Sequence, residues 1–236
     1  MEEMHVNSGE NVCRVYVLDN QMDLIVEKTN NKPFDCGNSI PQHIVVERDA
    51  KVDVVVLVMP GTDCDIKLDV RLAGEGAEAN VYGAYVCGGE EKVKISVDMH
   101  HDVPHCNSRQ LFKGIAGGVS RVDFYGKIIV AQDAQKTEAY QENHNILLSD
   151  GAKVDTKPQL EIYADDVKCS HGATIGRLNE EEQFYMRSRG ITLEDAKVLQ
   201  MISFIAPVLD YVENEDQRAA LSTEFESHIR NIITDM

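Results

Sequence analysis

The sequence predicts a mainly β protein that ends in an α-helical segment, and two observations support this prediction. Residues 11 to 175 contain many short runs rich in β-branched residues, most of which alternate apolar and polar residues with a period of two. Residues 179–236 show the apolar spacing and the capping residues of amphipathic helices. We therefore expect a β core domain over residues 1–178 and a C-terminal helical domain over residues 179–236.

The predicted strands recur roughly every dozen residues and are separated by Gly, Asp and Asn. They cover Val12–Leu18, Val52–Met59, Ile66–Leu72, Asn80–Cys87, Val93–Met99, Val122–Val130, Asn145–Ser149 and Gln159–Tyr163. No amphipathic helix pattern of useful length interrupts them, which argues against an open parallel sheet built from βαβ units.

A weak repeat precedes several of these strands. Residues 49–53 (DAKVD) and 151–155 (GAKVD) are nearly identical, and residues 76–80 and 133–138 are looser copies. Each copy begins with a turn residue followed by a small residue. Short strands with small residues at the corners suit a β-solenoid, in which each coil stacks on the last. Because the period is irregular, a sandwich or a barrel fits this pattern about as well.

Three helices are predicted after residue 178. Asn179 is a good N-cap for a first helix that stops near Gly190. Thr192 and Asp195 resemble a capping box for a second helix, which Pro207 is expected to disturb. A third helix is expected over Glu215–Ile233. This acidic segment suits either a solvated cap over the end of a solenoid or a docking surface for a partner, and composition alone favours the cap.

Composition excludes several classes of function. The chain has 236 residues with 40 Asp and Glu against 23 Lys and Arg, a formal charge of −17. Such a charge excludes a general nucleic-acid binder and argues against docking on anionic membranes. No run approaches the ~20 apolar residues of a membrane span, and residues 1–5 do not resemble a signal peptide. We therefore expect a cytoplasmic protein.

A phosphate-binding loop is also missing from the sequence. The one Gly-Lys pair, Gly126-Lys127, is followed by Ile128 rather than by Ser or Thr. Any nucleotide hydrolysis must therefore be carried out by a partner protein.

Cysteine and histidine supply the candidate ligands. The six cysteines are scattered singly, and we interpret Cys13, Cys36, Cys64, Cys87 and Cys106 as reduced, buried, small hydrophobic residues. The segment His100–Cys106 holds three histidines and a cysteine, which invites a metal interpretation. Its spacing matches no common zinc site, so ordinary histidines at a strand end are the default.

Cys169 and His171 form the second candidate site. If residues 167–171 are extended, both side chains point to the same face, ~6.6 Å apart along the strand. The neighbouring Lys168 is expected to lower the pKa of the thiol. Two ligands do not complete a metal centre, so the others would have to come from elsewhere, including another chain. Spacing alone favours a buried cysteine and a hydrogen-bonded histidine over a site.

A pair of carboxylates, Asp165 and Asp166, suggests the polysaccharide-cleaving solenoids as an enzymatic alternative. Adjacent residues on a strand face opposite ways, so one turn does not easily aim both carboxylates at one bond. The sequence also contains no Trp that would stack on sugars.

A family resemblance emerges from four stretches. They are residues 131–139 (AQDAQKTEA), 145–149 (NILLS), 155–174, which end in KCSHGAT, and 184–191 (FYMRSRGI). Together they closely resemble the SufB/SufD family, the scaffold subunits of the SUF iron–sulfur cluster assembly machine, and the KCSHGAT string favours SufD. The resemblance implies a right-handed parallel β-helix followed by a C-terminal helical domain.

The resemblance also implies partners and a site. A SufD-type chain pairs with a SufB-like subunit through the β-helix and binds a SufC-like ATPase through the C-terminal helices. Cys169 and His171 match the family positions that lie at the SufB–SufD interface and handle the nascent cluster. They would thus be incomplete iron or cluster ligands in a non-enzymatic scaffold. The chain alone would hold no stable cofactor, only a transient Fe–S cluster or its precursors in complex with SufB, and would form a homodimer when isolated.

One feature departs from the family pattern. SufD proteins usually carry a long, largely helical N-terminal region, whereas strand-like sequence starts here by Val12, so we expect a short or truncated family form. Two other functions stay open: a self-associating structural β-solenoid without a cluster role, and a solenoid polysaccharide lyase or hydrolase.

Overall fold

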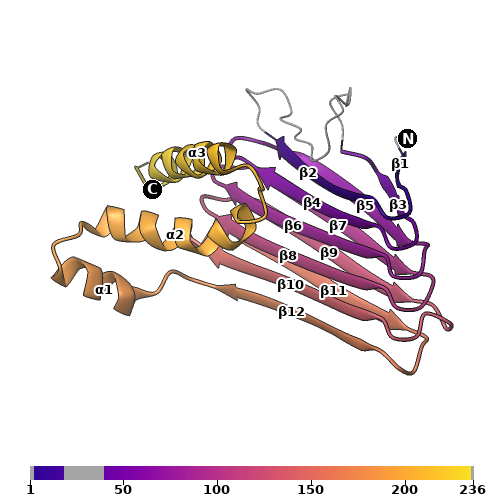
Figure 1. The fold of residues 1–236 in the computed structure, drawn as a ribbon. Coiled ribbons are helices and arrows are strands. Elements are labelled where there is room, and N and C mark those ends of the chain that lie inside the picture. The colour runs from indigo at the N-terminus through magenta and orange to yellow at the C-terminus, as the bar shows by residue number, and fades with distance from the viewer. Residues whose placement is uncertain (1–2, 19–39, 235–236) are drawn as a thin grey trace.

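The computed structural model describes residues 3–18 and 40–234, which form a parallel β-solenoid followed by three helices (Figure 1). The strands alternate along the chain between two six-stranded parallel sheets, so each coil adds one strand to each sheet. The odd sheet contains β1 (Glu3–Val6), β3 (His43–Val46), β5 (Cys64–Leu72), β7 (Lys92–His101), β9 (Arg121–Val130) and β11 (Lys153–Ile162). The even sheet contains β2 (Asn11–Leu18), β4 (Lys51–Val58), β6 (Glu78–Cys87), β8 (Asn107–Ala116), β10 (Glu138–Leu147) and β12 (Lys168–Gly176).

All eight predicted strands are present, and the structure adds β1, β3, β8 and β12. The inward side of β8 explains why its pattern was missed. Ser108 and Gln110 point into the solenoid and are 3% and 0% exposed, so polar residues occupy positions where alternation predicts apolar ones. The predicted strand at Asn145–Ser149 is the C-terminal part of β10, whose earlier inward residues are polar for the same reason.

The interior of the solenoid is a stack of inward-facing side chains. Parallel register places each residue beside its counterpart on the next coil, so Val54 of β4 lies beside Val81 of β6. Glycine makes room where large rings cross the interior: a Cβ on Gly114 would collide with the ring of Tyr85. The small residues of the sequence repeat are buried at the corners. These are Ala50, Ala77, Ala134 and Ala152, so the repeat does mark solenoid corners.

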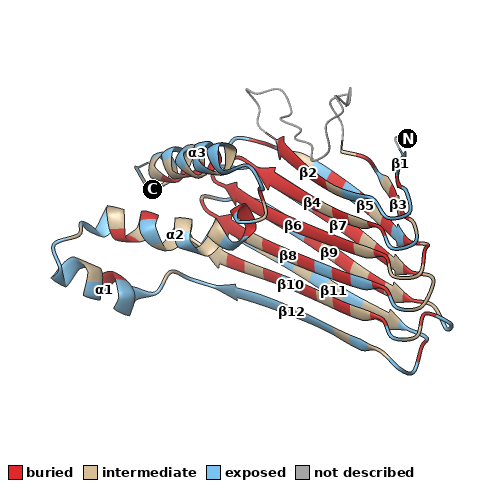
Figure 2. Cartoon of the chain, viewed as in Figure 1, coloured by how far each residue is buried: buried red, intermediate tan, exposed pale blue. Residues whose placement is uncertain are grey.

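The second and third helices pack on the outer face of the even sheet, not over the end of the solenoid, so the expected end cap is wrong (Figures 1 and 2). The first helix packs against the second. The helices are α1 (Glu180–Ser188), α2 (Leu193–Leu209) and α3 (Glu215–Thr234). The second half of β4 is buried on both faces, and its outward residues Val55 and Leu57 share one apolar cluster with Met201 of α2 and Phe225 of α3. Apolar residues on the outer face of a sheet are stable when another layer buries them, and α2 and α3 form that layer here.

The predicted helix starts are confirmed. The Asn179 side chain accepts hydrogen bonds from the backbone N–H groups of Glu181 and Glu182, and Thr192 caps α2 through Asp195. Pro207 does not end α2, which continues to Leu209. Pro207 lies in the last turn of the helix, and burial of Val208 and Leu209 holds that turn against the sheet. Because one apolar cluster spans sheet and helices, the division at residue 178 stays a prediction.

No helix among the described residues is long and apolar enough to cross a membrane.

Candidate functional site

Within the described residues, strand β12 is the last strand of the even sheet and has β10 as its one neighbour there. Its register places Cys169 beside Ala139 and His171 beside Gln141, and both of these β10 residues are buried inside the solenoid. Paired residues of parallel strands point the same way, so Cys169 and His171 both face the inner side of the final coil. The prediction that they share a face is therefore confirmed.

The two side chains are accessible because they lie at the open end of the solenoid. No described residue forms a further coil beyond β12, whose surface is largely exposed (Figure 2). Cys169 packs half-buried against the interior cluster, while His171 is exposed. A second molecule can reach both residues without unfolding this chain.

Lys168 does not activate the Cys169 thiol, contrary to the sequence-based expectation. Adjacent strand residues face opposite sides, so the ammonium group of Lys168 points outward and lies 2.7 Å from Oε1 of Glu138. Burial raises the pKa of the Cys169 thiol, although a hydrogen bond from the backbone of Ala139 opposes this rise. The thiol of this chain is thus protonated at neutral pH, and an incoming cation or metal must displace its proton.

Cys169 and His171 do not form a complete metal site within this chain. Over residues 3–18 and 40–234, no group of three or more His, Cys, Asp or Glu side chains is arranged to hold a metal ion. The two donors thus supply half of a four-ligand shell at most.

The segment His100–Cys106 does not converge on one point. His101 faces the interior, where its Nε2 lies 2.8 Å from Oγ of Ser108, and burial lowers its pKa to about 4. His100 points outward toward Asp69, at 3.4 Å. His105 sits in a turn with a positive φ of 61°, and Cys106 is buried. These residues are strand-end side chains with separate surroundings.

The remaining sequence candidates are structural. Cys13, Cys87 and Cys106 are buried and Cys64 is half-buried, with no disulfide among the described cysteines; Cys36 lies outside the described residues. Burial raises the pKa of Cys64 to about 11 and that of Cys87 to about 12. Asp166 forms an ion pair with Lys136 in the turn before β12, so it is not poised beside Asp165 as a catalytic pair.

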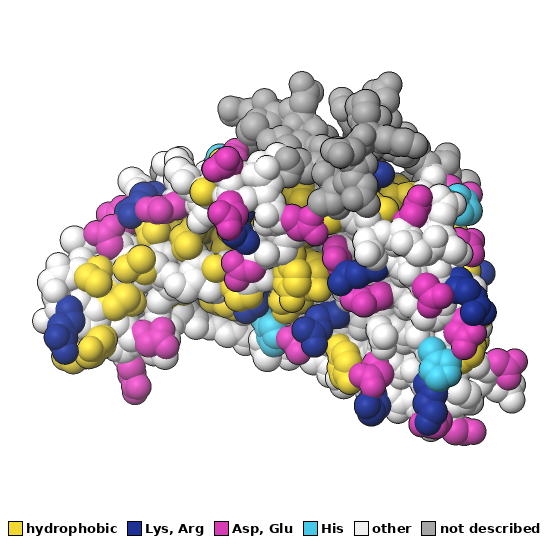
Figure 3. Space-filling view, in the orientation of Figure 1, with side chains coloured by type: hydrophobic (Ala, Val, Ile, Leu, Met, Phe, Trp, Pro, Cys, Tyr) yellow, Lys and Arg dark blue, Asp and Glu magenta, His cyan; other side chains and the backbone are white. Residues whose placement is uncertain are grey.

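Sequence reasoning missed an exposed apolar surface on α1 and α2, which we call the helical patch. It consists of Phe184 (73% exposed), Tyr185 (59%), Leu193 (43%) and Leu199 (48%). Figure 3 shows apolar side chains gathered over these helices. The sequence does contain a sign of this surface, because three large apolar residues follow one another at Phe184-Tyr185-Met186. In α1 the buried residue is Gln183, so these apolar side chains are left toward solvent.

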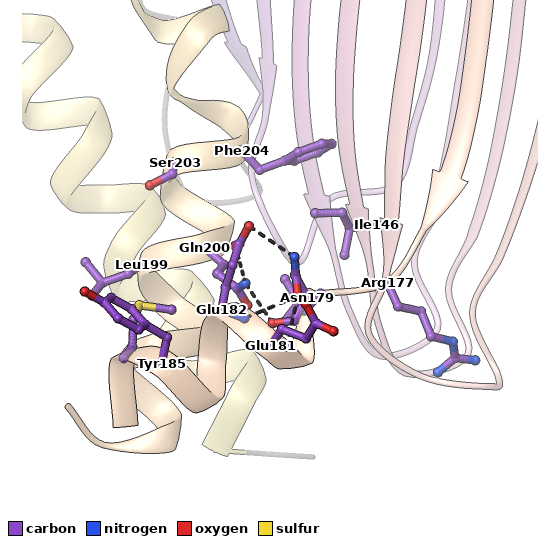
Figure 4. Close-up of a pocket in the computed structure, with 12 residues that line it drawn as sticks. Ile146, Arg177, Asn179, Glu181, Glu182, Tyr185, Leu199, Gln200, Ser203 and Phe204 are labelled. Atoms are coloured by element: carbon purple, nitrogen blue, oxygen red, sulfur yellow. Dashed lines mark hydrogen bonds between the residues drawn. The ribbon is translucent and has the colours of Figure 1, made fainter. Parts of the chain in front are cut away.

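A groove of about 630 Å³ lies between α1, α2 and the ends of the last even strands (Figure 4). Its apolar lining comes from Ile146, Leu178, Tyr185, Met186, Leu199 and Phe204. Gln200 of α2 ties α1 in place, because its side chain donates to the backbone oxygen of Asn179 at 3.0 Å and to Oε2 of Glu182 at 2.7 Å. α1 is thus joined to α2 by side chains and to β12 by residues 177–179.

The fold and the site together define a class of protein: a parallel β-solenoid whose last, open-edged strand presents a Cys-x-His pair and leads directly into a helical appendage. The family model for the SUF system FeS cluster assembly SufBD core domain matches residues 8–204. The chain therefore belongs to the SufBD family.

Individual relatives agree with this assignment. The chain is 50% identical over 117 residues to the iron–sulfur cluster assembly protein SufD of Escherichia coli K12, which covers 50% of this chain and 28% of that protein. It is 47% identical over 109 residues to a SufBD family protein of Synechocystis, a match that covers 46% of this chain and 24% of that protein. A SufBD family protein of Mycobacterium leprae is 28% identical over 195 residues, a match that covers 79% of this chain and 50% of that protein. The chain thus matches at most half the length of these relatives.

Proposed function

We propose that this chain is a SufD-type scaffold subunit that supports iron–sulfur cluster assembly in the cytoplasm without catalysing a reaction itself. A SufB-like subunit pairs with the open end of its solenoid, and a SufC-like ATPase binds its C-terminal helices. The observation that carries the proposal is the position of Cys169 and His171 on one accessible side of an edge strand. Membership of the SufBD family supports the same conclusion.

The open edge of β12 suits strand pairing with another chain. Edge strands present unpaired backbone N–H and C=O groups, which a partner strand can satisfy. A partner docked there brings its own side chains beside Cys169 and His171. Iron or a cluster fragment, as the cargo of the complex, then receives donors from both chains, and binding releases the proton of the Cys169 thiol.

The helical patch suits the ATPase. Large exposed apolar side chains in one region mark protein interaction surfaces, and Phe184 and Tyr185 lie on a helix that only three residues separate from β12. A displacement of α1 by a nucleotide-driven partner therefore reaches the strand that carries His171 directly. This connection gives ATP hydrolysis a mechanical route to the assembly site.

The role of His171 is tested in a reconstituted complex with SufB-like and SufC-like partners. We expect H171A to lower the rate of cluster assembly at least ~10-fold, because a lost ligand removes on the order of 1–3 kcal/mol of binding. The matched control is H144A, since His144 lies on the neighbouring strand β10, one coil earlier, but faces outward, 2.8 Å from Thr174. An H171A complex that assembles clusters at the wild-type rate would remove His171 from the mechanism.

The helical patch is tested with the double variant F184S/L193S. We expect the ATPase to lose co-purification at least ~10-fold, about 1.4 kcal/mol, while the melting temperature stays unchanged because both side chains are already exposed. V119S is the control, since Val119 is 54% exposed in the turn before β9. ATPase binding retained by the double variant would place the docking surface elsewhere.

Self-association through the same free edge is the second candidate function. Two copies can pair their β12 strands, so we expect the isolated chain to be a homodimer. Adding a SufB-like subunit separates the two functions: exchange into a heterodimer supports the scaffold, and a persistent homodimer supports a plain structural solenoid.

A further inference from the structure

On its even-sheet side the interior of the last coils is lined by amides, whereas the odd-sheet side stays apolar through Phe124 and Ile128. Gln110 of β8 and Gln141, Asn143 and Asn145 of β10 all face inward and are at most 2% exposed. Asn145 is hydrogen-bonded to Asn143 and Tyr85, but Oε1 of Gln141, Nε2 of Gln110 and Nδ2 of Asn143 are buried without a partner among the described residues. Each such atom costs about 1–3 kcal/mol, which calls for an explanation other than stability.

Gln141 and Gln110 form an amide ladder along the solenoid axis. Nε2 of Gln141 donates a hydrogen bond to Oε1 of Gln110 at 2.9 Å. Oε1 of Gln141 is buried and has no hydrogen-bond partner among the described residues, and the same holds for Nε2 of Gln110. The ladder therefore ends in a carbonyl oxygen that lacks a donor.

The opposite sheet makes space for this arrangement. Gly126 of β9 lies across the interior, and a Cβ added to it would collide with the amide nitrogen of Gln141. The Gln141 side chain thus spans the solenoid from the even sheet to the backbone of the odd sheet. Contacts with Gly126 and Gln110 hold the amide in place from two directions.

His171 is the next member of the same stack. Gln110, Gln141 and His171 are register partners on β8, β10 and β12, and all three face the same side. Neighbouring strands lie ~4.8 Å apart, so the side chain of His171 starts one strand away from the amide whose oxygen lacks a donor, and a turn of its ring brings a ring nitrogen near that oxygen. The neighbouring inward amide, Asn143, is stacked instead on Ala173, which has no polar side chain.

We propose that Gln141 is a positioning residue for His171. In the described conformation Oε1 of Gln141 has no hydrogen-bond partner; when the ring of His171 turns toward the interior, this oxygen accepts a hydrogen bond from one ring nitrogen, which fixes the tautomer and leaves the other ring nitrogen unprotonated. A metal-binding histidine is commonly held this way, with its second nitrogen donating to an oxygen. Gln110, one coil earlier, holds the amide of Gln141 through the hydrogen bond between the two side chains. This inference rests on the proposed role of His171 and adds how the chain prepares that residue before a partner arrives.

The test is NMR spectroscopy of the ring nitrogens in the full 236-residue chain, with the His171 signals assigned by their loss in H171A. In the wild type we expect one dominant tautomer of His171. In Q141L, which preserves volume but removes the acceptor, we expect a mixture of tautomers. N143L is the matched control and should leave the His171 signals unchanged. Thermal unfolding shows that each variant is folded, and Q141M replaces Q141L if that variant is not.

The outcomes separate this inference from the proposed function. His171 signals that are identical in the wild type and in both Gln141 variants would overturn the positioning role, as would an equal response to N143L. A shift specific to the Gln141 variants supports it, whatever the cluster assembly rate. Assembly that is insensitive to H171A would overturn only the proposed function.

Discussion

His101 illustrates how one buried side chain links this fold to pH. Its ring is 0% exposed inside the solenoid, with one nitrogen bonded to Ser108 and the other, Nδ1, without a partner among the described residues. Burial disfavours the charged ring and lowers its pKa from 6.5 to about 4. At pH values between these two, the unfolded chain binds a proton that the folded chain excludes.

Stability should therefore fall as the pH drops below about 6.5. Because the folded pKa is depressed, the contribution of His101 is complete above the unfolded pKa and is lost toward pH 4, with roughly 2 kcal/mol of unfolding free energy lost between pH 7 and pH 5. Urea unfolding at both pH values measures this change. The double variant H101L/S108A removes both partners of the buried hydrogen bond, so its unfolding free energy should change less between pH 7 and pH 5 than that of the wild type. A change as large as in the wild type would assign the pH dependence to other groups.

At the scale of elements, the helices are held by packing rather than by charge. Phe225 of α3 is 0% exposed in the apolar cluster with α2 and the even sheet, whereas the ion pair between Arg230 of α3 and Asp195 of α2, at 2.8 Å, lies at the surface. Exposed ion pairs contribute ~1 kcal/mol or less, so the apolar contacts dominate.

Replacing the buried ring of α3 should thus cost more than breaking its ion pair. We expect F225A to lower the free energy of unfolding by about 3–5 kcal/mol, because it leaves a cavity. R230M should lower it much less, because water screens an exposed ion pair. Denaturant titration followed by circular dichroism measures both values, and a larger loss for R230M would reverse this ranking.

At the scale of the whole molecule, α2 and α3 form a second apolar core with the outer face of the even sheet, beside the core inside the solenoid. They bury Val15, Val55, Leu57 and Val86, which would otherwise form an apolar surface on the even sheet. A solvent-exposed patch of this kind promotes aggregation.

Removal of residues 192–236 should therefore destabilise the solenoid as well as remove partner contacts. We expect the truncated chain to bind a hydrophobic dye and to elute as aggregates in size-exclusion chromatography, while the intact chain does neither. A monodisperse, dye-free truncated chain would show that the β domain folds without its cover. Point variants of the helical patch are for this reason the cleaner test of ATPase binding.

Strands were predicted where apolar inward residues alternate regularly with polar outward ones, as in β5, β7 and β9. The polar inward residues of β8 and β10 left one strand unpredicted and the other shortened, and β3 is too short to show a period. Cys169 and His171 were paired by their spacing, because strand geometry has a period of two. The polar stack beneath His171 joins residues about 30 positions apart, which spacing along the chain does not reveal.

By itself, the sequence determined the β-rich core, the three helices and their caps, and the common face of Cys169 and His171, since all of these follow from local periodicity and hydrogen bonding. Only the tertiary structure decided that α2 and α3 cover the even sheet, that Lys168 pairs with Glu138 of the neighbouring strand, and that His171 is the register partner of Gln141 at an open edge. These features depend on which coil stacks on which, and this is set by contacts between residues far apart in the chain.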